Sequence, residues 1–330
     1  MINIYPWQLS VWQRIHQQRE RLSHALLLHG RAGTGKLDFA QHLSQSLLCS
    51  APNNSEACNA CPQCTWFKEG AHPDFKFITP EDAETSEDAP KKKSSKKTQI
   101  SVDQIRQLIQ ALSLTNHGVN SLRVVLIHPA ESLNTASANA LLKVLEEPPN
   151  NTIFILVSHQ IHRLLPTILS RCQSVAMPLP ARDEAVAWLT AQKVANAVDM
   201  LDYYGGAPLT VLQAQQDLSA QASVFQQLAK GAKLDSPTCA GLLVEQGMEQ
   251  AITLMQKWVF DLQLSLHNMP NHYHVAMVKP LQALAKSVNL NGLLEFQRVL
   301  VQAKQTANHP LSQELQLETL LLQYKRVFKH

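Results

Sequence analysis

Short apolar runs alternate with amphipathic stretches through the first half of the chain. Four runs have the length and composition of buried strands: residues 25–28, 75–78, 123–127 and 153–157. Three stretches between them repeat their apolar positions at helical spacing: residues 36–48, 101–112 and 136–146. Ser101 and Gln104 form a capping box at the start of the second of these helices. The alternation is typical of a parallel sheet covered by helices, so we predict an α/β fold for this half.

The pattern changes after Pro178, where the strand-like runs stop. Residues 183–192 and 197–204 are predicted to form two short helices, which a Gly-Gly pair ends. Three longer apolar stripes then step by three and four residues: 248–266, 293–307 and 317–328. Such stripes are the core-facing or partner-facing sides of helices, so the second half is predicted to be all-helical.

Composition and charge narrow the function classes. The 330 residues are 45% hydrophobic, enough for two or three domains with cores of their own. Lys and Arg number 29 against 26 Asp and Glu, and a formal charge of +3 is too small for a sequence-independent nucleic-acid binder. No apolar run has the roughly 18 residues of a membrane span, and the first residues lack the pattern of a signal peptide. We therefore expect a soluble cytoplasmic protein with no membrane partner.

A strongly charged segment interrupts the first half at about residues 80–98. It holds five acidic residues and five lysines, so its charges cancel. We predict a solvated, disordered insertion. The alternative, a lysine patch for DNA phosphates, is weakened by the adjacent acids.

Residues 30–36 read Gly-Arg-Ala-Gly-Thr-Gly-Lys, which fits the P-loop pattern between a predicted strand and a predicted helix. Gly30, Gly33 and Gly35 let main-chain amides turn toward a phosphate, and Lys36 neutralises terminal phosphates. The context predicts a P-loop fold, with these four residues as candidate nucleotide-binding residues.

The residues that would hold magnesium and activate water are absent from this loop and its surroundings. Leu37 stands where a P-loop ATPase has Ser or Thr. The strand at 123–127 is followed by His128 and Pro129 rather than by acidic residues, and Glu131 lies two residues late. We predict that hydrolysis is lost, whereas weak nucleotide binding to the loop stays open.

Four of the six cysteines, Cys49, Cys58, Cys61 and Cys64, are separated by eight, two and two residues. Four thiolates at this spacing can surround zinc tetrahedrally and leave no position for water, so the predicted role is structural. The intervening segment is too polar to fold alone, and metal binding can supply the missing stabilisation. Iron would also accept four thiolates, and four unligated thiols are the remaining alternative.

Two further motifs are more specific than the P-loop. Residues 138–149 read ANALLKVLEEPP and residues 169–172 read Leu-Ser-Arg-Cys, and both resemble signature motifs of AAA+ clamp-loader subunits. The opening Tyr5-Pro6-Trp7, the HALLLHG strand and the four-cysteine module are similar to the delta prime branch of that family in bacterial DNA polymerase III. The resemblance extends from the N-terminus to about residue 180 and is weaker in the helical tail.

This resemblance implies a three-part architecture. An AAA+ P-loop domain at residues 1–178 would carry the zinc module at about 49–64. A small helical lid domain at 179–208 and an all-helical collar domain at 209–330 would follow, and the collar would hold a hetero-oligomer together.

The resemblance also implies a role in DNA replication. Clamp loaders use ATP bound by gamma or tau subunits to place the sliding clamp on primed DNA, with delta as a further partner. Delta prime members have a defective nucleotide site, which agrees with Leu37, His128 and Pro129. The chain would then be a non-catalytic stator, with no active site of its own inside a holoenzyme that polymerises DNA.

Arg171 is the residue that the resemblance singles out for catalysis. In the Ser-Arg-Cys motif its guanidinium would act in trans, as an arginine finger on the nucleotide of a neighbouring motor subunit. The alternative for Arg171 is a surface arginine in a local ion pair. Lys143 and Glu146 face a subunit interface or form a helix-surface pair, and the sequence does not decide between these.

Two other functions remain open at this stage. One is a motor subunit that hydrolyses ATP itself, against which Leu37 and the missing acidic residues argue. The other is a zinc-dependent DNA-binding protein, which predicts tight, salt-sensitive binding of duplex DNA by the chain alone.

Overall fold

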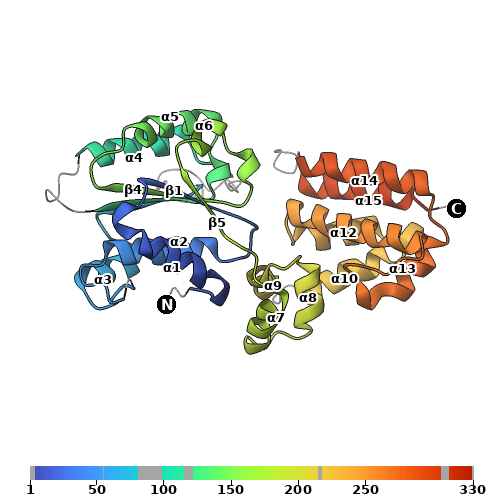
Figure 1. Cartoon of the computed structure of the whole chain (residues 1–330). Helices are drawn as coiled ribbons and strands as arrows, with labels where there is room; N and C mark the ends of the chain where they lie inside the picture. The colour runs from blue at the N-terminus through green and yellow to red at the C-terminus, as the bar shows by residue number, and fades with distance from the viewer. Residues whose placement is uncertain are drawn as a thin grey trace. The chain divides into compact units, whose positions relative to one another are not determined.

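The computed structural model describes residues 4–54, 56–80, 99–114, 122–214, 218–305 and 312–328 (Figure 1). The predicted insertion therefore lies almost wholly outside the described residues. The chain divides into two compact units, Met1–Glu184 and Ala185–His330. Among the described residues, no helix combines the length and the apolar character needed to cross a membrane.

The first unit is built on a five-stranded sheet in the order β2-β3-β4-β1-β5, and every neighbouring pair is parallel. The strands are β1 (Ala25–His29), β2 (Phe75–Ile78), β3 (Arg123–Ile127), β4 (Thr152–Ser158) and β5 (Gln173–Ala176). The four predicted strands are confirmed, and the α/β prediction with them. Strand β5 was missed, because only Val175 of its four residues is buried and it carries no apolar run.

Helices cover both faces of the sheet (Figure 1). On one face lie α1 (Leu9–Gln17), α2 (Lys36–Leu48) and, beyond α2, the short α3 (Pro62–Lys68). On the other lie α4 (Val102–Leu114), α5 (Thr135–Glu146) and α6 (Pro166–Leu169). Strand β1 shows the cause: Leu26 and Leu28 join the core under α2, whereas Leu27 joins the core under α5.

The capping box at the start of α4 is confirmed. The main-chain N–H of Ser101 donates to Gln104 Oε1 at 2.9 Å, and the N–H of Gln104 donates to Ser101 Oγ at 3.3 Å. The two side chains thus satisfy two main-chain donors that the first turn of the helix leaves free.

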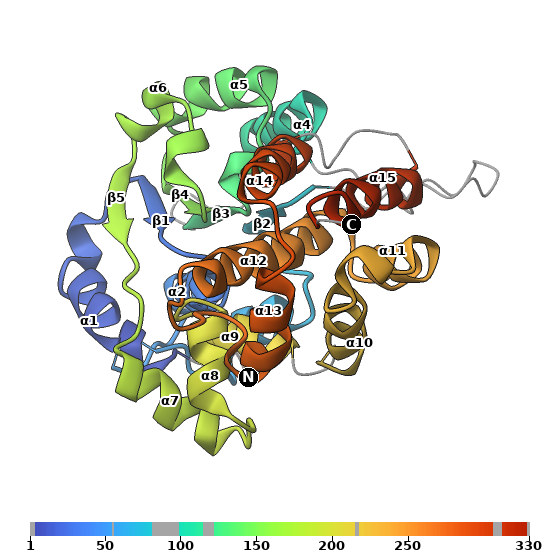
Figure 2. The ribbon, with the colours of Figure 1, turned by 90° about the vertical axis from the view of Figure 1, so that its right-hand side faces the viewer.

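The described part of the second unit is entirely helical, as predicted. Its helices are α7 (Arg182–Ala191, whose first residues belong to the first unit), α8 (Ala197–Tyr203), α9 (Pro208–Ala214), α10 (Leu218–Leu228), α11 (Ser236–Val244), α12 (Met248–Leu266), α13 (Val278–Ala285), α14 (Leu290–Gln305) and α15 (Gln313–Lys325). Helix α12 packs against α13 and α14, and α11 packs against α15 (Figure 2). The first predicted stripe coincides with α12. The last extends past the end of α15 to Phe328, which is nevertheless buried.

Two contacts tie the helices of the second unit together. Trp258 Nε1 on α12 donates to the hydroxyl of Tyr324 at 2.8 Å, and that hydroxyl donates to the carbonyl of Leu228 at 2.9 Å. Lys257 Nζ donates to the carbonyl of Tyr203 at 2.6 Å and lies 3.7 Å from the centre of the Tyr203 ring. The second contact joins the end of α8 to α12, because a cation is favoured at a helix C-terminus and over an aromatic face. The predicted boundary between a lid and a collar at residue 208 stays a prediction.

Candidate functional site

The P-loop joins β1 to α2, as the sequence predicted, and its glycines are needed where they stand. Gly35 has a φ of 81°, and a Cβ on it would lie 2.4 Å from the ring of Tyr5. A Cβ on Gly30 would lie 2.5 Å from the carbonyl oxygen of Met177. Any side chain at either position would collide with a neighbour, so the turn requires glycine.

Residues before β1 hold the P-loop from outside. Trp7 Nε1 donates to the carbonyl of Thr34 at 3.0 Å. Gln8 Nε2 donates to the same carbonyl at 2.8 Å and to that of Gly35 at 2.9 Å. The Tyr5 hydroxyl donates to Asp38 Oδ2 at 3.0 Å on the first turn of α2. The Tyr5-Pro6-Trp7 motif and Gln8 therefore fix the loop conformation, which no local sequence signal reveals.

Lys36 ends the P-loop and begins α2, and its side chain turns back into the loop. It is 2% exposed, and its ammonium donates to the carbonyl of Arg31. Burial lowers the pKa of Lys36 to about 8, and the opposite charge of Glu131 only partly counters this effect. The cation is thus held inside the loop by the loop's own main chain.

Histidines occupy the place where an ATPase has acidic residues. His128 follows β3 and His159 follows β4, and their Nε2 atoms lie 3.2 Å apart. Burial, with the neighbouring His159 and Lys36, lowers the pKa of His128 to about 4, so this ring is neutral at pH 7. Glu131 accepts from the main-chain N–H of His159 at 3.0 and 3.2 Å, which ties the late carboxylate to the end of β4.

Leu37 offers no oxygen ligand at the magnesium position. Its side chain packs against the apolar core that α1 and α2 share with the sheet. Leu37 thus leaves the magnesium position without a hydroxyl, and histidines rather than carboxylates follow β3 and β4. The nearby carboxylate of Glu131 accepts from the main-chain N–H of His159. Sequence reasoning found Leu37 and His128 but missed His159, which lies 31 residues further along the chain.

The four predicted metal ligands come together. The sulfur atoms of Cys49, Cys58, Cys61 and Cys64 all lie within 4.8 Å of one another. Cys49 and Cys61 are 3.9 Å apart and Cys58 and Cys64 are 4.0 Å apart. A zinc tetrahedron with bonds of about 2.3 Å has sulfur–sulfur edges of about 3.8 Å, so the cluster fits the ion.

Main-chain amides point at these sulfurs. The N–H groups of Cys58, Cys61 and Cys64 donate to the Sγ atoms of Cys49, Cys58 and Cys61, at 3.3, 3.3 and 3.5 Å. Such bonds orient the ligands and favour the thiolate form that a metal requires. Around them the module buries little besides sulfur and Ala57, so its apolar core is minimal.

Arg171 follows α6 and lies beside the end of α5. Its guanidinium pairs with Glu146 Oε1 at 2.5 Å and donates to the carbonyl of Thr167 at 3.0 Å. The two side chains remain 34% and 49% exposed, so the pair is reachable from solvent. The fold thus brings the Leu-Ser-Arg-Cys motif against the ANALLKVLEEPP motif, which the sequence had left unconnected.

Comparison with known proteins places the chain in a family. A family model described as DNA polymerase III, delta subunit, matches residues 6–180. DNA polymerase III subunit delta' of Pseudomonas aeruginosa is 34% identical over 338 aligned positions, which cover 98% of either chain. The subunits of the same name from Escherichia coli K12 and Bacillus subtilis are 33% and 35% identical over 57% and 48% of this chain. They match over 53% and 43% of their own lengths.

The solved structure of a DNA polymerase III gamma-subunit-related protein from Thermotoga maritima covers 97% of this chain and 99% of its own. It is 18% identical in sequence, with a TM-score of 0.49. The sequence matches carry the assignment: one relative aligns along nearly the whole chain at 34% identity, and the family model spans more than half of it. This chain therefore belongs to the DNA polymerase III subunit delta' family.

Proposed function

We propose that this chain is a non-catalytic stator subunit of a DNA polymerase III clamp loader. It would assist ATP-dependent loading of the sliding clamp onto primed DNA, while gamma or tau subunits bind and hydrolyse the ATP and delta completes the assembly. Family membership supports the assembly. The observation that carries the non-catalytic role is the neutral His128–His159 pair where carboxylates are needed, beside an apolar Leu37.

We assign a structural zinc ion to the four-cysteine centre. Cys49, Cys58, Cys61 and Cys64 supply all four positions of a tetrahedral ion, so no position remains for substrate or water. The ion would hold the segment between α2 and α3 in place of an apolar core.

Arg171 is the group through which this chain would act on a neighbour's chemistry. A guanidinium can donate two parallel bonds to phosphate oxygens and stabilise the charge that spreads over them during transfer. In the isolated chain the guanidinium of Arg171 forms an ion pair with Glu146. The half-exposed ion pair is worth only about 0–1 kcal/mol, so a nucleotide phosphate on an adjacent subunit can displace Glu146 at small cost.

The first test is MgATP turnover by the purified chain alone. We expect none above background, because Leu37 offers no hydroxyl to magnesium, histidines follow β3 and β4, and the nearby Glu131 carboxylate is bonded to the main-chain N–H of His159. The Lys36→Ala variant is the control for a contaminating ATPase. Turnover by a contaminant would be the same in preparations of the parent and of this variant. Turnover that disappears with Lys36→Ala would overturn the stator assignment and make the chain a motor.

The second test is hydrolysis by the reconstituted clamp loader with clamp and primed DNA. Arg171→Ala is expected to slow ATP turnover by about tenfold or more, and Arg171→Lys should rescue little because it lacks the two-pronged donor. Arg106→Ala removes another exposed arginine that pairs with a carboxylate, Asp103, and should leave the rate unchanged. Equal rates for Arg171→Ala and Arg106→Ala would make Arg171 a surface residue only.

A further inference from the structure

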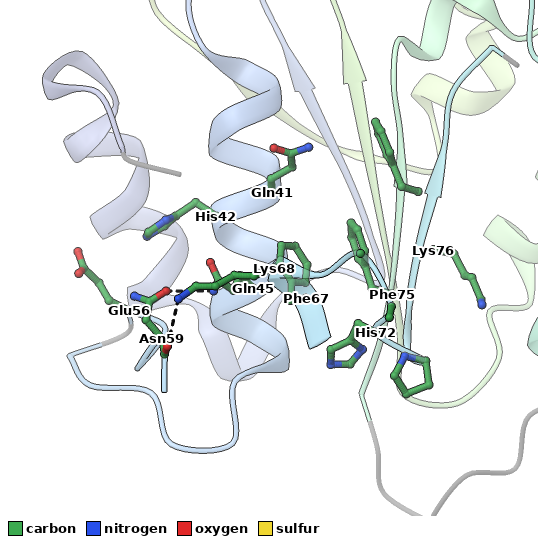
Figure 3. A pocket seen from close by; sticks show the side chains of 14 residues that line it. Gln41, His42, Gln45, Glu56, Asn59, Phe67, Lys68, His72, Phe75 and Lys76 are labelled. Atoms are coloured by element: carbon green, nitrogen blue, oxygen red, sulfur yellow. Dashed lines mark hydrogen bonds between the residues drawn. The ribbon is translucent and has the colours of Figure 1, made fainter. Parts of the chain in front are cut away.

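A groove of about 1130 Å³ lies beside the four-cysteine module (Figure 3). Gln41 and Gln45 of α2 line it on one side, and Phe75 and Lys76 of β2 line it on the other. Phe77 of β2 is a further lining residue. Pockets for small ligands usually enclose about 300–1,000 Å³. The size and open shape of this groove suit a segment of polypeptide better than a small molecule.

The groove runs along the β2 edge of the sheet, where no other described strand pairs with β2. Neighbouring residues of a strand point to opposite faces. Phe75 packs into the core under α2, so Phe77 shares that face, whereas Ile78 packs under α4 and α5 and shares its face with Lys76. A groove that both Lys76 and Phe77 line must therefore pass around the strand's outer edge.

The main chain of Phe77 is available at that edge. The carbonyls of Asp74 and Ile78 accept from Val124 and His128, so alternate residues of β2 direct their polar groups toward β3. Phe77 then directs its N–H and C=O outward, and no hydrogen bond from another described residue meets them there. Its ring is 41% exposed. An open edge with an exposed phenylalanine invites pairing with another strand.

The groove wall also contains a buried donor without an acceptor. The N–H of Asp74 donates to Nδ1 of His72 at 3.1 Å. Burial lowers the pKa of His72, so its neutral ring carries the proton on Nε2. His72 is 5% exposed, and Nε2 has no hydrogen-bond partner among the described residues. A carbonyl or carboxylate oxygen is the partner that this atom lacks.

We propose that the outer edge of β2 binds an extended, acidic peptide segment of a partner protein, which adds a strand to the sheet. Main-chain bonds to Phe77 would supply affinity, and an acceptor on the segment would settle against His72. Acidic side chains are expected because Lys68 and Lys76 flank the groove, whereas Glu56 is its single carboxylate among the described residues. This surface lies apart from the P-loop and from Arg171, so the proposal does not depend on the stator role.

The test begins with random peptides displayed on phage and selected on the full-length, zinc-loaded chain. We expect the selected peptides to be rich in Asp, Glu and β-branched residues. Phe77→Pro deletes the outward N–H without removing a bond to β3, and it should weaken these peptides by about tenfold or more. Ser174→Pro is the matched control, because β5 forms the opposite edge of the sheet. The residues on either side of Ser174 direct their main-chain polar groups toward β1, so the N–H of Ser174 also points outward.

Further measurements separate edge pairing from mere proximity. Peptide binding should protect the Phe77 amide from hydrogen exchange, and Phe77→Ala, which keeps that amide, should retain part of the affinity. If Phe77→Pro fails to fold, the paired charge reversal Lys68→Glu and Lys76→Glu tests the same site, and it should weaken acidic peptides and no others.

Several outcomes would overturn the proposal. The first is a selection that enriches no peptide, and the second is a set of peptides that bind Phe77→Pro as tightly as Ser174→Pro. Displacement of the peptides by single-stranded oligothymidylate would point to nucleic acid as the occupant. If the chain forms concentration-dependent dimers and Phe77→Pro abolishes them, the occupant is a second copy of the chain.

Discussion

Lys36 places a buried positive charge in a P-loop that is followed by the apolar Leu37. Its ammonium is buried, and its acceptor, the carbonyl of Arg31, also receives the Thr34 hydroxyl at 3.0 Å. The structure therefore does not need the lysine to satisfy the loop. Retaining a buried cation costs stability that a phosphate ligand would repay.

This reasoning gives a pH-dependent prediction for Lys36→Met. The pKa of Lys36 is lowered from 10.5 to about 8, so the unfolded chain binds this proton more tightly than the folded chain. Stability is lost as the pH falls from about 10.5 to about 8, and the whole cost is present at pH 7. Lys36→Met should raise the free energy of unfolding at pH 7 by about 1–2 kcal/mol and flatten its pH dependence in that window.

Urea unfolding across this pH range measures both effects, with Lys143→Met on the exposed face of α5 as the control. The control should change neither the free energy nor its slope with pH. A Lys36→Met variant less stable than the parent at pH 7 would mean that the loop solvates the ammonium well.

At single positions, the sequence was informative wherever one residue type decides the chemistry. Leu37 and His128 cannot ligate magnesium as Ser and Asp do, and the sequence alone is enough to show this. Gln8 and His159 could not be found in that way. Their partners lie 26 to 31 residues away, and no local periodicity encodes such a distance.

Among the secondary-structure elements, the four-cysteine module depends on two helix ends. Cys49 directly follows α2, and Cys61 is the N-cap of α3, where its sulfur accepts from the N–H of Cys64. Loss of one thiolate should therefore free both helix ends. The spacing of the cysteines predicted the cluster, but its place between two helices required the fold.

Cys61→Ser is expected to weaken zinc affinity by at least about 100-fold. The purified parent should be colourless with one zinc per chain, whereas the variant should lose the metal to a mild chelator. Cys172→Ser, a lone buried cysteine under α5 and α6, is the control and should keep its zinc. Colour from iron, or full zinc in Cys61→Ser, would refute the four-thiolate zinc site.

The strands show which elements a hydrophobic pattern can predict and which it misses. Strands β1, β3 and β4 are buried on both faces, so each stands out as an apolar run. Strand β5 lies at the sheet edge with three of its four residues exposed, and its sequence, Gln-Ser-Val-Ala, carries no such signal. An edge strand is defined by its neighbour, which the sequence of the strand itself does not contain.

At the scale of the whole molecule, two units with separate cores account for the change of pattern after Pro178. The first unit buries its apolar residues on two sheet faces, and the second buries them in a large cluster around Trp258 and a smaller one around Leu189 and Leu201. Periodicity predicted both fold classes because strand and helix cores repeat differently. It did not reveal the pairing of Arg171 with Glu146, which only the packing of α6 beside α5 creates.

Helix α2 connects the P-loop directly to the four-cysteine module. Lys36 begins it and Cys49 follows it, so a single helix of about 20 Å has the P-loop at one end and a predicted zinc ligand at the other. We expect loss of the proposed zinc ion to fray this helix from its C-terminal end and to loosen the main-chain amides of its first turn. A preparation exposed to a chelator would then behave like a loop mutant, although every residue of its P-loop was intact.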